Sequence, residues 1–178
     1  MKQTSHHKTT KVEIHMNFRD ELSKEIHQEL ANTRKILERV PEDKFDWRPH
    51  AKSTNLLKLA THVATLSRFA TIIFETDSLD MSKFTPPPEA FSRKELLETF
   101  DKLAGAAEDA ITKASDDAFA ASWSLTAGAT PIFTMTKYAV LRRLFMNHLI
   151  HHRSQLIIYL RMNDVPIPGM YGPSADER

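Results

Sequence analysis

The chain has 178 residues, a formal net charge of +1 and no cysteine. Its length favours one domain with its own core, and its balanced charge gives no electrostatic reason to expect nucleic acid or an anionic membrane as a partner. The lack of cysteine excludes disulfides, thiolate metal ligands and a cysteine nucleophile. Residues 1–16 have no signal-peptide pattern, and no apolar run reaches 18 residues, so we expect a cytoplasmic protein that spans no membrane.

The first half of the chain predicts a polar arm followed by two helices. We expect residues 1–15 to form a mobile arm, and apolar residues at steps of three and four predict an amphipathic helix over 17–40. Pro41 ends this helix, and a loop follows over 41–52. A second helix is predicted over 55–76, capped by Ser53 or Thr54, and its apolar stripe includes His62.

The second half predicts two further helices. The linker 77–91 contains three consecutive prolines and, when extended, is long enough to run the length of a bundle, which permits parallel second and third helices. Ser92 and Glu95 form a capping box that opens a helix to about residue 115. Residues 116–135 read as short extended pieces or a loop. Residues 137–162 lack Gly and Pro and predict one long helix, so the pattern as a whole predicts an all-α four-helix bundle.

Three histidines lie on predicted apolar faces. His148 and His152 are four residues apart on one face of the last helix, and His62 is on the second helix. A single histidine on such a face is usually a hydrogen-bonded core residue, and a pair at this spacing arises readily by chance. Metal ligation by all three is the competing interpretation. His151 leaves a further alternative open, because it could chelate together with His148.

The residues missing from this region restrict its chemistry. No acidic residue lies between 137 and 162, which excludes a His-Glu-x-x-His protease helix. Three neutral imidazoles would leave a metal with positions for water or substrate, and nitrogen ligands suit Zn, Ni, Co or Fe. The nucleophile would be a water or a thiol activated by the metal, and activity should fall below about pH 6.5 as the ligands become protonated.

Several short motifs resemble the DinB/YfiT-like family. The stretch from Asn147 to Leu156 reads NHLIHHRSQL and is similar to the terminal signature of that family, which is typically HxxxHRGQL. A Tyr-Leu-Arg run, a Val-Pro-containing end, the run Trp47-Arg48-Pro49 and the sequence before His62 also agree, over roughly residues 18–172. Ser154 stands where the family usually has Gly, which affects helix packing and removes no ligand.

The resemblance implies a fold, a metal site and a class of function. The fold is an up-down-down-up four-helix bundle with a long crossover, here over residues 16–172 with a loose tail at 173–178, and many members are dimers. The metal, most often Ni or Zn, would be held by His62, His148 and His152, which favours His152 over His151 as the last ligand.

For function, the resemblance implies a metal-dependent enzyme that activates a low-molecular-weight thiol or water against a small electrophile, as a thiol S-transferase or hydrolase. The alternative is a non-catalytic metal-binding dimer with a stress-related role. We expect a homodimer with a small-molecule substrate, and we expect Trp47, Asn55, His151 and Tyr171 to line the substrate pocket.

Overall fold

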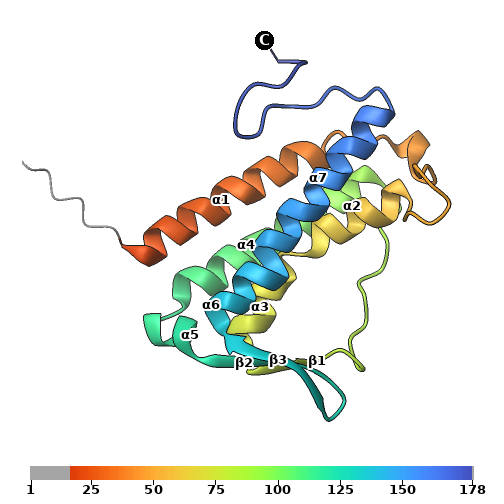
Figure 1. The fold of residues 1–178 in the computed structure, drawn as a ribbon. Helices are drawn as coiled ribbons and strands as arrows, with labels where there is room; N and C mark the ends of the chain where they lie inside the picture. Colours follow the sequence, from red (N-terminus) through yellow and green to blue (C-terminus); the bar gives the residue numbers. More distant parts are fainter. Residues whose placement is uncertain (1–16, 178) are drawn as a thin grey trace, which may run out of the picture.

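The computed structural model describes residues 17–177, and the predicted arm at 1–15 lies outside this range. The elements of the chain are, in order, α1 (Phe18–Leu37), a 3-10 turn (Glu42–Lys44), α2 (Leu56–Thr65), α3 (Arg68–Glu75), β1 (Ser78–Asp80), α4 (Arg93–Lys113), α5 (Asp116–Ala120), β2 (Ser122–Ala127), β3 (Thr130–Thr136), α6 (Lys137–Val140), a π-helical stretch (Leu141–Met146) and α7 (Asn147–Met162). Figure 1 shows that the long helices lie side by side, with the strands gathered at one end.

Four main helical segments form the predicted bundle. They are α1, α2 with α3, α4, and the run from α6 to α7, and the linker after β1 returns along the bundle so that α4 runs parallel to α2 and α3 (Figure 1). Both α1 and the α2–α3 segment contact α4 and α7. The core between them is apolar and includes Leu30, Leu59, Phe100 and Leu156, each at most 4% exposed. The predicted all-α, up-down-down-up bundle with its long crossover is confirmed.

A small sheet closes one end of the bundle. β2 pairs with β3 as an antiparallel hairpin and with β1 in parallel, and the register shifts between Leu125 and Thr126. The hairpin turn contains Gly128 with φ of +60°, a conformation in which a side chain is strained. Trp123 of β2 is fully buried and donates its indole N–H to Thr76 at 3.2 Å. The stretch expected to be extended pieces or a loop is therefore a hairpin preceded by a short helix, and the linker supplies a strand.

The second helix is interrupted, so the prediction of one helix over 55–76 is wrong. The break comes at residues 66 and 67 and begins four residues after His62. The hydroxyl of Thr65 donates to the carbonyls of Thr61 and His62 at 2.9 and 3.2 Å, a bond of the kind that bends helices. The cap of α2 is also different from the prediction, because Asn55, rather than Ser53 or Thr54, accepts the N–H of Lys58.

The last helix runs over residues 137–162 as predicted, but its winding is not regular throughout. Its π-helical stretch ends directly before Asn147, and α3 packs against it. Val140, Leu141, Phe145 and Met146 are all fully buried. These buried positions recur at steps of five, which is the repeat of i→i+5 hydrogen bonding. Both helices that carry the three histidines therefore depart from regular winding beside them.

The segment Leu56–Glu75 is long and apolar enough to cross a membrane by composition, although 67% of its most apolar window is buried in the bundle. Burial of this kind is ordinary for a core helix. The absence of a membrane partner stays a prediction.

The C-terminal segment folds back on α7. Arg161 forms an ion pair with Asp176, whose carboxylate also accepts the N–H of Ile167 at 2.8 Å. Glu177 accepts the N–H of Gly169 at 2.7 Å. Up to residue 177 the tail therefore has defined contacts, and its looseness at 173–178 stays a prediction.

Candidate metal centre

The structure brings His62, His148 and His152 together between α2 and α7. The Nε2 atom of His148 lies 3.3 Å from that of His62 and 2.9 Å from that of His152. Each of the three residues offers one nitrogen, and these nitrogens all lie within 4.8 Å of one another. All three side chains are half-buried. A cluster of this kind is an arrangement that could hold a metal ion.

Hydrogen bonds at the other ring nitrogen set the direction of each lone pair on α7. His148 Nδ1 lies 3.4 Å from the carbonyl of Leu144, and His152 Nδ1 lies 2.8 Å from the Gln155 amide oxygen. Both partners only accept, so each Nδ1 carries the proton and each Nε2 has a free lone pair. The two α7 nitrogens that approach within 2.9 Å are thus both acceptors, and a shared cation removes the repulsion between them.

The protonation of the cluster fits the same interpretation. The pKa of His62 is lowered to about 4, first because burial disfavours the imidazolium and then because His152, His148 and Arg68 add repulsion. Burial also lowers the pKa of His148 and of His152. All three imidazoles are therefore neutral at pH 7, which is the form that binds metals.

The nitrogen spacings agree with a metal at the centre. Two Zn–N bonds of 2.0–2.1 Å place their nitrogens about 3.3 Å apart at a tetrahedral angle and about 2.9 Å apart at a right angle. The observed 3.3 and 2.9 Å match these two values. The residues present therefore fit a three-nitrogen divalent metal site, and the spacing suits either geometry.

The structure places His151 outside the nitrogen cluster but close to it. Its Nε2 accepts a hydrogen bond from the Gln155 amide at 3.1 Å, while the oxygen of the same amide accepts from His152. Gln155 therefore links the two histidines and orients His152. Gln155 follows His152 by three residues and His151 by four, so all three lie on one side of the helix. This spacing could have predicted the contact, but the sequence analysis did not use it.

The other three predicted pocket residues lie apart from the nitrogen cluster. Trp47 packs edge-on against Tyr159 of α7, with ring centroids 5.5 Å apart. The side chain of Asn55 caps α2. The Tyr171 hydroxyl contacts Glu29 and Arg153. Their part in binding a substrate stays a prediction.

A buried ion pair lies directly beside the ligand-bearing face of α7. Arg153 and Glu29 are 2% and 7% exposed, and their charged atoms are 2.6 Å apart. Arg153 also donates to the Glu29 carbonyl at 2.9 Å and to the Thr33 hydroxyl at 3.2 Å, and Tyr171 caps the pair at 2.6 Å. Since Arg153 follows His152 in the chain, this network fixes how α7 is rotated against α1. This network could not be predicted from the sequence, because an arginine on a helix is usually exposed.

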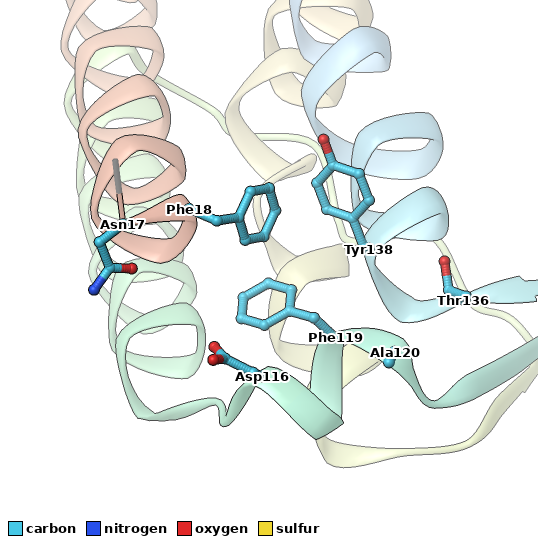
Figure 2. A pocket seen from close by; sticks show the side chains of 7 residues that line it. All are labelled: Asn17, Phe18, Asp116, Phe119, Ala120, Thr136 and Tyr138. Atoms are coloured by element: carbon cyan, nitrogen blue, oxygen red, sulfur yellow. The ribbon is translucent and has the colours of Figure 1, made fainter. Parts of the chain in front are cut away.

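Two cavities bear on where a ligand would bind. One of about 730 Å³ lies where α1 begins, and Figure 2 shows the rings of Phe18, Phe119 and Tyr138 turned toward one another in it. It contains no histidine, and Tyr138 precedes His148 by ten residues, about 15 Å along a helix. A smaller cavity of about 190 Å³ borders His62. We assign function to the imidazoles, because an apolar recess alone supplies no reactive group.

The sequence of this chain matches a known protein family. The model of the DinB superfamily matches residues 25–156 of this chain, which include all three histidines. The chain belongs to the DinB superfamily. A comparison with curated proteins finds no match.

Two solved structures of DinB-like proteins share the fold. The one from Bacillus subtilis has a TM-score of 0.67 and 17% identity, over 89% of this chain and 99% of its own. The one from Bacillus cereus has a TM-score of 0.66 and 19% identity, over 83% of this chain and 94% of its own. At these identities the likeness to the two solved structures concerns the fold alone. The match to the DinB superfamily model confirms the predicted family membership.

Proposed function

We propose that this DinB-superfamily protein is a metal-dependent enzyme whose ion, Zn or Ni, is held by His62, His148 and His152. The observation that carries the proposal is the convergence of three Nε2 atoms, two of them shown by their Nδ1 partners to present lone pairs. A divalent ion supplies Lewis acidity, which lowers the pKa of a water or thiol at its open positions.

The residues of the chain determine what such a centre can do. Three neutral ligands leave the positive charge of the ion uncompensated, which favours an anionic nucleophile. The half-buried rings leave one side accessible to a small molecule. We therefore propose attack on a small electrophile by a low-molecular-weight thiol or by water, that is, thiol S-transfer or hydrolysis. The balanced charge supports a role without nucleic acid. We also propose a cytoplasmic homodimer, as expected from the N-terminal sequence and the family resemblance.

A second candidate is a non-catalytic metal-binding dimer with a stress-related role. The absence of any acid between residues 137 and 162 favours it, because no general base lies beside the two α7 histidines in the sequence. The two candidates predict the same metal content and differ in turnover.

Metal analysis of untagged protein, followed by an assay, tests the proposal. We expect about one divalent ion per chain, loss of that ion in His152→Ala, and retention in His27→Ala, which changes an exposed surface histidine paired with Glu108. Conjugation of a thiol to a chromogenic electrophile, or hydrolysis of an ester, should require His152. Fewer than about 0.2 ions per chain, with unchanged stability after chelation, would refute the metal site. Full metal without turnover would favour the second candidate.

A further inference from the structure

The cavity beside His62 lies between α2 and the proline-containing linker. Its volume is about 190 Å³, and its walls are formed by Lys58, Thr61, His62, Thr65, Pro86, Pro87 and Glu89. This is less than the roughly 300–1,000 Å³ of most ligand pockets, so it suits one end of a small molecule. Because His62 forms part of the wall, a group in this cavity lies directly beside the metal centre.

A lysine at this cavity has only a loose partner. Lys58 lies four residues before His62, on the same face of α2. Its ammonium nitrogen is 3.7 Å from a carboxylate oxygen of Glu89, which is longer than a hydrogen bond, and both side chains are largely exposed. The pair is therefore weak, and Lys58 is free to contact an incoming anion.

The half-buried Arg68 has no anion at all among residues 17–177. Its guanidinium carbon lies 4.3 Å from the centre of the Phe84 ring. Its Nε is buried and makes no hydrogen bond within the described residues. By contrast, Arg34, Arg142 and Arg161 each pair with a carboxylate. A buried guanidinium nitrogen without an acceptor is costly, so a ligand that accepts from it gains binding energy.

Arg68 is not part of the cavity wall, but it follows the wall residue Thr65 by three residues and lies beside the wall. Phe84, on which it lies, belongs to the same linker as Pro86 and Pro87 of the cavity wall. The charge of Arg68 also acts on His62, since it contributes to the lowered pKa of that imidazole. His62 is thus flanked by two cations, with Glu89 as the acid of the cavity wall.

We propose that this cavity binds the carboxylate of the small molecule on which the metal centre acts, with Lys58 of its wall and Arg68 beside the wall as the two partners. The side chains of Lys58, Arg68 and Glu89 together carry one positive charge in excess, which suits an anionic group such as a carboxylate. The cavity volume suits a carboxylate and a short chain. The inference rests on the proposed function, because it gives the substrate class of the same site.

Binding to cobalt-loaded protein tests this proposal without turnover. The probes are 3-mercaptopropionate and its methyl ester, which carry the same thiol and differ in charge, and the readout is the thiolate-to-cobalt absorption band. We expect the acid to bind at least about 10-fold more tightly, the lower end for a charge-assisted hydrogen bond. Arg68→Gln should abolish this preference, and Glu89→Gln should strengthen it.

The control is Arg143→Gln, since Arg143 also lies over a phenylalanine, Phe133, at 4.6 Å. It should keep the full preference. If Arg68→Gln does not fold, Arg68→Lys, which loses the planar fork, should show a reduced preference. An unchanged preference in the Arg68 variant, or stronger competition by inorganic phosphate than by acetate, would overturn the carboxylate site.

The outcomes separate this inference from the proposed function. If cobalt does not bind, or neither thiol gives a band, the metal-centre proposal itself fails. If both thiols give the band with equal affinity, the metal centre stands and the carboxylate site is overturned.

Discussion

The buried pair of Arg153 and Glu29 gives a sharp prediction about stability. Arg153→Met keeps much of the volume and removes the charge. The Glu29 carboxylate, 7% exposed, then keeps only the Tyr171 hydroxyl at 2.8 Å as a side-chain donor. Breaking one side of a buried pair costs about 3–5 kcal/mol, because the other charge remains desolvated. We therefore expect the free energy of unfolding to fall by about that amount.

Urea unfolding followed by circular dichroism measures this loss. For a domain of this size, about 3–5 kcal/mol lowers the midpoint of thermal unfolding by about 6–20 °C. Arg142→Met is a matched control on the same helical run, because Arg142 pairs with Glu25 at 2.7 Å while both side chains stay substantially exposed. It should cost less than about 1 kcal/mol.

Two results would refute this reasoning. A loss below about 1 kcal/mol in Arg153→Met would mean that water reaches the Glu29 carboxylate in the variant. In the double variant Arg153→Met with Glu29→Leu, most of the loss should return, because no buried charge remains. A double variant as unstable as the single one would place the loss in packing instead of charge.

Two further predictions concern the metal centre. Gln155→Leu removes the acceptor of His152 Nδ1, so metal affinity in competitive chelator titration should fall about 10–100-fold with little change in fold; unchanged affinity would show that Gln155 does not orient His152. For metal-free protein, the folded-state pKa of His62 is about 4, against 6.5 for the free side chain. The unfolded chain therefore binds its proton first, and the free energy of unfolding should fall as the pH drops from about 6.5 towards 4. Urea titrations across this range should show a smaller fall for His62→Asn, and an equal fall would contradict the shifted pKa.

The sequence was sufficient for the features that depend on local pattern. Apolar residues spaced three and four positions apart located the main helices. Ser92 caps α4 by accepting the N–H of Glu95 at 3.2 Å, as predicted. The spacing of His148 and His152, with His62 on another apolar face, made a three-histidine site one of the open interpretations. The family resemblance favoured this site and His152 over His151.

Features that depend on competing hydrogen bonds or on residues distant in the chain could not be predicted from the sequence. The break after α2 depends on the Thr65 hydroxyl, which donates a hydrogen bond to a backbone carbonyl of its own helix. The five-residue repeat in the π-helical stretch is hidden by Leu144, an apolar residue that also fits a regular helix. β1 pairs with β2, which lies more than forty residues later in the chain, so the local pattern of either segment does not show the pairing. Arg153 is buried only because α1 and the C-terminal segment supply its partners.

The π-helical stretch also sets an angular phase along the last helix. Each residue of a regular α-helix advances the chain by about 100° around its axis. Because each π-helical residue advances by less than this, rewinding all six residues of Leu141–Met146 as a regular α-helix would turn His148 and His152 by roughly that angle relative to the hairpin end. The metal nitrogens and the buried arginine would then face different neighbours. The wider winding of this short stretch thus decides whether the histidines of α7 meet the one on α2.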